Sequence, residues 1–275
     1  MILFDSHAHI NHERYSDGGR AELAGDIESS DVGYVADIGF DLSSSALAVE
    51  NAGRWDWCYA VVGVHPHEVK GLDEDAIPLL KGLAGKPKVV AIGEIGLDYY
   101  RDLSPREDQQ RWFRKQIRLA LELGMPIVIH DRDSKGDTIR ILTEEGAFDG
   151  QRTGRFPASG ETGYPDARVL LHCFSGSAEE ALKFISMGAT ISIAGPVTYS
   201  NNRKTVDVAA RVPLAHLLVE TDAPYLSPEP FRGKPNASHF VEFTAKKVAE
   251  IKGVSIEEVA ATTCENAKRF YNIEN

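Results

Sequence analysis

Short runs of apolar and β-branched residues recur along the whole chain and alternate with longer segments of helical periodicity. The runs are Met1–Ser6, Gly33–Gly39, Cys58–Val64, Lys88–Gly93, Pro126–Ile129, Arg168–Leu171, Ala189–Ile193 and Leu217–Val219. Continuous apolar runs are typical of strands buried on both faces, and their alternation with helices indicates parallel strands. Eight such units predict a closed (β/α)₈ barrel, or TIM barrel, with an open doubly wound sheet as the competing architecture.

The length of the chain agrees with one barrel domain. A (β/α)₈ barrel usually takes roughly 250 residues, so we expect residues 1–275 to form a single domain. Residues 148–167 are rich in Gly, Pro and polar residues and lack apolar periodicity, so we interpret them as a long loop before the sixth strand. A loop that leads from a helix to a strand belongs on the barrel face opposite the chemistry.

Capping patterns mark several helix boundaries. Candidate capping boxes are Ser104 with Glu107, Ser177 with Glu180 and Ser255 with Glu258. In the first of these, Pro105 would occupy the first helical position, and Gly124 is expected to end that helix.

Composition excludes several classes of protein. No apolar stretch approaches the roughly 20 residues that span a bilayer, and the first residues do not resemble a secretory signal, so we expect a cytoplasmic protein without membrane contact. The three cysteines are widely spaced, which argues against a disulfide framework or a cysteine-rich zinc site. The net charge of −11 argues against non-specific binding of nucleic acid through a broad basic surface, but not against a local site. We expect a monomer.

The first strand ends in two histidines, His7 and His9. Side chains two residues apart on a strand point the same way, so both imidazoles are expected to face the barrel mouth and share one metal ion.

Other expected strands also end in ionisable residues. Glu94 follows the fourth strand, His130 the fifth, His172 the sixth and Asp222 the eighth. Barrel active sites are built at the carboxyl ends of the strands, so these side chains are expected to converge with the first two histidines. Helix capping could explain one such residue, but not all of them together.

This set of donors suits Zn²⁺, Mn²⁺ or Fe²⁺ and, if weakly held, Mg²⁺. Four histidines and two carboxylates suffice for two divalent ions, and we assign Glu94 as the carboxylate that bridges them and Asp222 as the catalytic base. His65 is assigned to substrate contact rather than to metal, Asp5 to orienting His7, and Cys173 to packing.

Basic and aromatic residues gather in the loops that follow the expected strands. The basic residues are Arg101, Arg132, Lys135, Arg203, Lys204, Arg232 and Lys234, and the aromatic ones are Tyr99, Tyr100, Phe174, Tyr199, Tyr225 and Phe231. Cationic side chains hold phosphates and aromatic rings stack on bases, so an anionic substrate that carries bases is expected.

The motifs DSHAHIN, GVHPHE, AIGEIGLDYYRD, SPREDQQRWF, MPIVIHDRDS, LHCFSG, ETDAPYLSP and FRGKPN resemble, in this order, those of the TatD family of metal-dependent deoxyribonucleases, within the amidohydrolase-like barrels. The resemblance covers nearly the whole chain. It implies one metal held by His7, His9, Glu94 and Asp222, and a second held by Glu94, His130 and His172. It also implies that His65, Arg101 and Arg232 contact the substrate. Residues 148–167 depart from the family by their length.

The resulting hypothesis is a hydrolase with two divalent ions (Mg, Mn or Zn) that cleaves phosphodiesters, as a 3′–5′ exonuclease on single-stranded DNA. Water activated by the ions would attack phosphorus while Asp222 accepts its proton. RNA and tRNA are the other nucleic acids that would fit. An alternative uses the same centre as an ester hydrolase, such as a D-aminoacyl-tRNA deacylase, or on a small amide or lactone. A third interpretation is a barrel that binds metal or nucleic acid without turnover.

Overall fold

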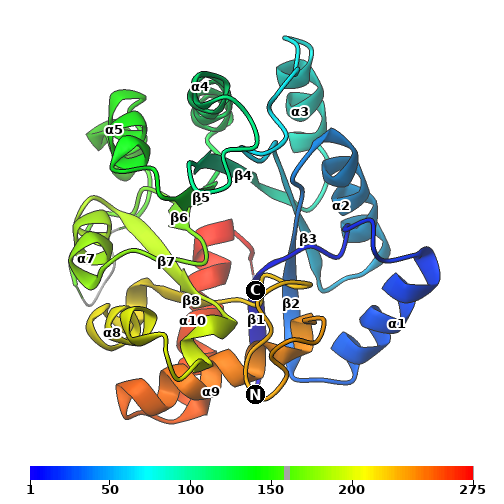
Figure 1. Ribbon diagram of the computed structural model, residues 1–275, viewed down its shortest axis with the longest axis vertical. Helices are drawn as coiled ribbons and strands as arrows, with labels where there is room; N and C mark the ends of the chain where they lie inside the picture. Colours follow the sequence, from blue (N-terminus) through cyan, green and yellow to red (C-terminus); the bar gives the residue numbers. More distant parts are fainter. Residues whose placement is uncertain (158–161, 275) are drawn as a thin grey trace.

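A ring of parallel strands lies at the centre of the computed structural model, with helices around it (Figure 1). The structure describes residues 1–157 and 162–274. Within them the strands are β1 (Leu3–Ala8), β2 (Val32–Ile38), β3 (Cys58–Val62), β4 (Val89–Asp98), β5 (Ile127–Arg132), β6 (Val169–Leu171), β7 (Ala189–Ile193) and β8 (Leu217–Val219). Each strand is parallel to the next in sequence order. The ring closes where Ala8 pairs with Ala223, directly after β8. The predicted (β/α)₈ barrel is therefore confirmed, and the open sheet is excluded.

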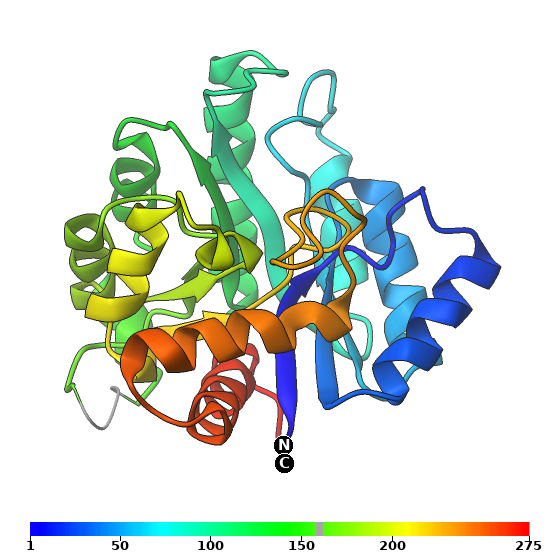
Figure 2. The ribbon, with the colours of Figure 1, turned by 60° about the horizontal axis from the view of Figure 1, so that its bottom comes forward.

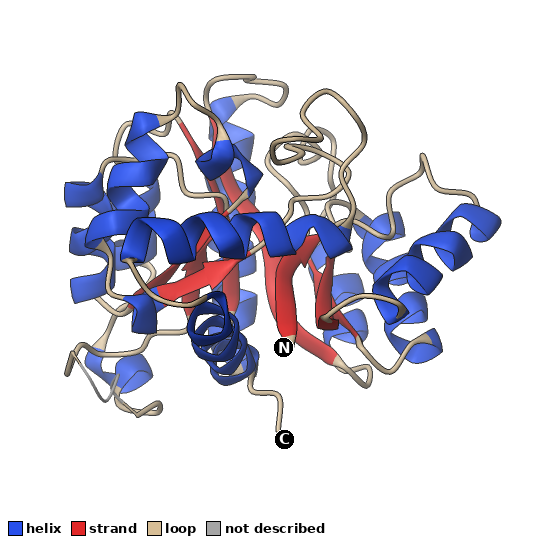
Figure 3. Cartoon of the chain, turned by 90° about the horizontal axis from the view of Figure 1, so that it is seen from below, coloured by secondary structure: helices blue, strands red, loops and turns tan. Residues whose placement is uncertain are grey.

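Helices cover the outside of this ring (Figure 3). They are α1 (Asp17–Glu28), α2 (Leu42–Arg54), α3 (Ala76–Ala84), α4 (Arg106–Leu123), α5 (Asp137–Glu144), α6 (Gly150–Thr153), α7 (Ala178–Ser186), α8 (Arg203–Arg211), α9 (Val241–Lys252) and α10 (Ile256–Tyr271), with 3₁₀ turns η1 (Gly195–Thr198), η2 (Leu214–His216) and η3 (Ser238–Phe240). In the described part of the chain, none of these helices is long and apolar enough to cross a membrane.

Side chains from the strands and from α10 fill the barrel interior at the amino-terminal ends of the strands, which form the barrel floor. Phe4, Val61, Val128 and Leu218 belong to one buried cluster with residues of that helix. Tyr271 stacks on Phe4 with ring centroids 5.8 Å apart. The barrel is therefore closed at the amino-terminal ends of its strands, and a cavity is left at their carboxyl ends.

Three strands extend further than their apolar runs predict. β1 continues past Ser6 and contains His7, and β5 continues past Ile129 and contains His130. β4 was expected to end at Gly93, but it extends to Asp98, so Glu94 lies inside the strand rather than after it. The prediction placed these strand ends wrongly because polar groups that face the site interrupt the apolar run while the backbone pairing continues. Glu94 is such a group, and it is buried.

Most of the predicted helix boundaries are confirmed. The Ser177 hydroxyl accepts from the backbone N–H of Glu180 while the Glu180 side chain accepts from Ser177, which is a complete capping box. Gly124 ends α4 with a φ of 67°. The box at Ser104 was wrong, because α4 begins after Pro105 without a side-chain cap and the Ser104 hydroxyl instead donates to the carbonyl of His67.

The segment 148–167 is not a simple loop, because it contains the short helix α6. Residues 158–161, which were also assigned to the loop, lie outside the described residues. The buried guanidinium of Arg152 donates to the carbonyls of Met125, Ala167 and Arg168. Since these carbonyls precede β5 and β6, the segment is fastened to the barrel face opposite the mouth, as expected.

Candidate active site

The two histidines of β1 lie side by side at the barrel mouth. His7 and His9 bring their Nε2 atoms to 3.3 Å from one another, as the two-residue spacing predicts. The Oδ1 atom of Asp222 lies 3.4 Å from Nε2 of His9 and 3.8 Å from Nε2 of His7. Residues from β1 and from the segment after β8 therefore meet where the barrel closes.

Glu94 lies at the centre of the site and directs its two oxygens to different neighbours. Oε2 lies 3.5 Å from His7 Nε2 and 3.9 Å from His9 Nε2. Oε1 lies 2.6 Å from His172 Nε2 and 2.7 Å from His130 Nδ1. The carboxylate thus connects two groups of histidines, which is the arrangement required of a bridging ligand.

The spacing of the first group fits a bound cation. Ligand atoms at about 2.1 Å from one tetrahedral zinc ion are about 3.4 Å from one another. The distances from His7 and His9 to one another, to Glu94 and to Asp222 run from 3.3 to 3.9 Å. In the second group, the contacts of Glu94 with His130 and His172 have the lengths of hydrogen bonds.

His65 lies closer to the second group than the sequence suggested. Its Nε2 atom is 3.6 Å from Glu94 Oε1, and His65, Glu94 and His130 form one cluster of possible metal donors. His65 therefore has the position of a ligand as well as that of a substrate contact.

The histidines of the cluster keep its two carboxyl groups, Glu94 and Asp222, in their charged form. Burial opposes ionisation of Glu94, but His172, His65 and His130 outweigh it and hold the pKa of its carboxyl well below the usual range. Burial likewise opposes ionisation of Asp222, and the hydrogen bond from His9 together with nearby imidazoles lowers its pKa. Both groups are thus anionic near neutral pH, as cation ligands must be.

Asp98 contacts two histidines of the site, His67 and His130, and was not predicted as a site residue. Its Oδ2 atom lies 2.8 Å from His67 Nε2 and 3.2 Å from His130 Nε2. Its Oδ1 atom accepts the backbone N–H groups of Tyr100 and Arg101. The signal was available, because Asp98 is four residues after Glu94 and an extended strand places both on one face.

Glu220 was missed for a different reason. It directly follows β8 and is fully buried, with Oε1 3.4 Å from His172 Nδ1. It lies two residues before Asp222, and only the aspartate of the ETD motif was predicted to belong to the site. Asp5 was assigned to orient His7, and its Oδ1 atom accepts the backbone N–H of His7 at 3.4 Å. Its shorter contacts are with the backbone N–H and hydroxyl of Thr221.

A cavity of about 790 Å³ opens above the cluster. Of the predicted rim residues, Arg101, Arg132, Phe174 and Tyr225 line it. Cys173 also lines it, which corrects its assignment to packing alone. Arg232 is not among the described lining residues, because its guanidinium lies over the ring of Tyr199 at 4.2 Å.

The barrel and this cluster of histidines and carboxylates define a metal-dependent hydrolase with an amidohydrolase-like fold. Residues 4–272 match the family described as TatD related DNase. The chain belongs to this family.

Relatives match over nearly their whole length. The metal-dependent hydrolase YabD of Bacillus subtilis is 40% identical over 99% of this chain and 100% of its own. The 3′-5′ ssDNA/RNA exonuclease TatD of Cronobacter sakazakii is 30% identical, with coverage of 98% and 97%. The crystal structure of YJJV, a TatD homologue from Escherichia coli K12, is 26% identical and superimposes with a TM-score of 0.85 over 99% of this chain and 98% of that one.

Proposed function

We propose that the protein is a deoxyribonuclease that removes nucleotides from the 3′ end of single-stranded DNA. The observation that carries the proposal is a buried cluster of cation donors at the base of a cavity whose rim holds Arg101, Arg132 and the half-exposed ring of Tyr225. The relationship to a 3′-5′ ssDNA/RNA exonuclease supports the same substrate class.

The residues that would hold two divalent cations (Mg, Mn or Zn) are those of the two groups around Glu94. His7 and His9 lie nearest Oε2 of Glu94, with Asp222 beside them, and His130 and His172 lie nearest Oε1. Two ions at such a site supply Lewis acidity toward phosphate oxygens and lower the pKa of water.

Side chains of the protein would accept the proton of the attacking water and bind the phosphate. Asp222 is charged and faces the cavity, so it can accept a proton from the attacking water. Arg101 reaches the cavity from the loop after β4 and would bind the phosphate. Arg232, which is stacked on Tyr199, would contact the DNA strand outside the cavity.

Substitution of Glu94 by Ala tests the core of the proposal. It removes the carboxylate that both histidine groups share, so metal content and nuclease activity should fall together to background. Metal content is measured by elemental analysis, and activity on end-labelled single-stranded DNA. Near-normal nuclease activity of this variant would contradict the proposal.

The substrate class is tested by parallel assays of the metal-loaded wild type on single-stranded DNA, RNA, D-aminoacyl-tRNA and simple esters or lactones. We expect shortening of DNA from its 3′ end to be the fastest reaction. Faster release of an amino acid from tRNA would assign the same centre to ester hydrolysis. A metal-loaded protein that is inert on every substrate would support the interpretation as a binding protein.

A further inference from the structure

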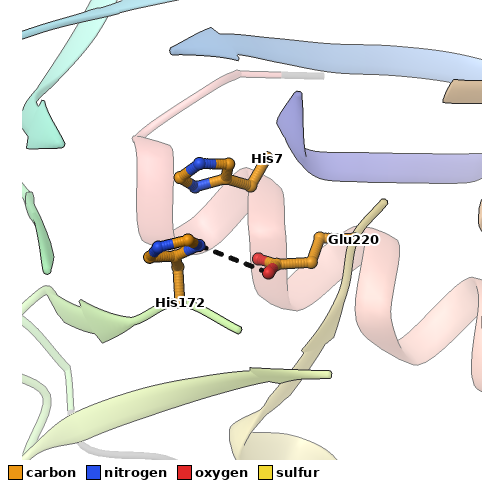
Figure 4. A group of neighbouring side chains, drawn as sticks. All are labelled: His7, His172 and Glu220. Carbon is orange, nitrogen blue, oxygen red and sulfur yellow. Dashed lines mark ion pairs between the residues drawn. The ribbon is translucent and has the colours of Figure 1, made fainter. Parts of the chain in front are cut away.

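Three buried polar atoms meet on the inner side of the metal-binding cluster, away from the cavity. They are Nδ1 of His7, Nδ1 of His172 and Oε1 of Glu220, and none has a hydrogen-bond partner among the described residues. Figure 4 shows the two imidazole rings one above the other with the Glu220 carboxylate beside them. The ring centroids are 3.8 Å apart and the planes are inclined by 11°. Buried polar atoms without partners are rare, so this group calls for an explanation.

The position of Glu220 is fixed by its other oxygen. The Ser192 hydroxyl on β7 donates to Oε2 at 2.5 Å. The same hydroxyl oxygen accepts the backbone N–H of Cys173 at 3.2 Å, so its single proton is directed to Glu220. The backbone N–H of Glu220 donates to the carbonyl of Ile193. Oε1 is thereby left facing His172 Nδ1 at 3.4 Å.

An imidazole can serve a cation through one nitrogen only if its proton is on the other. Nε2 of His172 faces Glu94, so a ligating His172 must carry its proton on Nδ1. A carboxylate that accepts this proton fixes the tautomer and the ring orientation, and it makes the ligating nitrogen more basic. Glu220 is the carboxylate that the structure places there.

We propose that Glu220 is a positioning residue that accepts the Nδ1–H of His172 and keeps Nε2 of this histidine free for a cation beside Glu94. His7 lies in the same group of possible metal donors as His172 and Glu220, so the carboxylate is beside one histidine from each of the two groups around Glu94. This inference rests on the metal centre of the proposed function.

A cation held by the three inner atoms is the competing explanation. It would require both imidazoles to bind metal through both nitrogens, because their Nε2 atoms already face Glu94. The hydrogen bond from Ser192 also uses one oxygen of Glu220. The positioning role needs only the protons that neutral histidines already carry.

The test compares Glu220→Gln with Asp166→Asn. Both variants turn a buried carboxylate into an amide, but Asp166 contacts Arg168 at 3.0 Å at the opposite end of the barrel. The metal-free proteins are titrated with Zn²⁺ by calorimetry. We expect Glu220→Gln to weaken binding by about 10- to 100-fold without changing the number of ions bound. Asp166→Asn should bind like the wild type.

A second measurement separates positioning from a general loss of structure. In the metal-loaded wild type, the His172 Nδ1–H should give a slowly exchanging, downfield proton resonance in NMR spectra. This resonance should move upfield in Glu220→Gln and stay in place in Asp166→Asn. If Glu220→Gln does not fold, Ser192→Ala decides, because loss of its hydroxyl should weaken Zn²⁺ binding by less than about tenfold in the same direction.

Unchanged Zn²⁺ affinity in Glu220→Gln, or in Ser192→Ala where that variant decides, would overturn the inference. Loss of one whole ion with the others bound normally would overturn it in favour of a cation among the inner atoms. A wild type that binds no divalent metal would instead refute the proposed function.

Discussion

Replacement of Asp98 by Asn should disturb the two histidines that this carboxylate holds, while its volume is preserved. Asp98 Oδ1 accepts two backbone N–H groups, and an amide oxygen can do the same. The amide nitrogen would then take the place of Oδ2, which lies 2.8 Å from His67 Nε2 and 3.2 Å from His130 Nε2. Nδ1 of His130 faces Glu94, so a ligating His130 carries its proton on Nε2. In the variant, the amide N–H of the new side chain would therefore face the Nε2–H of His130.

The size of the effect follows from these two contacts. A hydrogen bond to a charged group contributes about 1.5–3 kcal/mol. The side chains of His67 and His130 are 19% and 18% exposed, so water replaces part of each contact and the lower end of the range applies. We expect the free energy of unfolding of the metal-free protein to fall by roughly 3 kcal/mol. Zn²⁺ binding should weaken by about 10- to 100-fold.

The pH dependence of this loss has a definite sign. Burial opposes ionisation of Asp98, but the hydrogen bonds from His130 and His67 outweigh it and lower its pKa, so its contribution to stability is lost as the pH falls below about 4. Burial of His130 disfavours its charge, but Asp98 and Glu94 outweigh it and raise the pKa of this imidazole, so the added stability of its charged form is lost as the pH rises through the raised pKa. The difference between wild type and variant should be widest between these limits.

Urea unfolding of the metal-free proteins at several pH values measures this difference. Asp102→Asn is the matched control, because Asp102 lies in the loop after β4, close to Asp98 in sequence, but its side chain is 41% exposed and pairs with Arg106 on the surface. This control should unfold close to the wild type. Equal stability and equal Zn²⁺ affinity of Asp98→Asn and the wild type would refute the reasoning.

Three further predictions concern other parts of the molecule. Arg152→Met leaves three backbone carbonyls without their buried donor and should lower the free energy of unfolding by about 3 kcal/mol in urea titrations, with kcat unchanged because the site is at the other end of the barrel. Gly96→Ala would put a methyl group 1.9 Å from the carbonyl oxygen of His130, so circular dichroism melts should show a strongly reduced Tm or no folded protein. Tyr225→Ala should raise KM for single-stranded DNA by roughly 5- to 150-fold in steady-state assays, with turnover of small esters unaffected, because under the proposed function this ring at the cavity rim would stack on a base.

The fold could be predicted because the barrel strands are apolar on both faces. β7 and β8 contain only residues that suit such a strand, and their bounds agree with the prediction. Glu94 and His130 ended the apolar runs early, although the backbone of β4 and β5 continues past them. A polar residue that ends an apolar run therefore indicates the site and not the end of the strand.

The metal-binding cluster was predictable because parallel strands of a barrel bring their carboxyl ends together. That rule placed His7, Glu94 and Asp222 near one another without any knowledge of loops. It could not distinguish metal donors from the residues behind them, because Asp98 and Glu220 also lie at the carboxyl ends of strands. The orientation of Arg232 depends on its contact with Tyr199, which sequence spacing does not determine.

The helix α10, which closes the barrel floor, lies on the same side of the barrel as the start of β1. Arg168, at the amino-terminal end of β6, donates to the carbonyl of Phe270, and Tyr271 donates to the carbonyl of Ser6. Figure 2 shows the start of β1 and the red helix α10 on the same side of the barrel. A fluorophore or surface tether at either end would therefore lie away from the cavity. Single molecules could be immobilised through the floor with the mouth directed toward the solution.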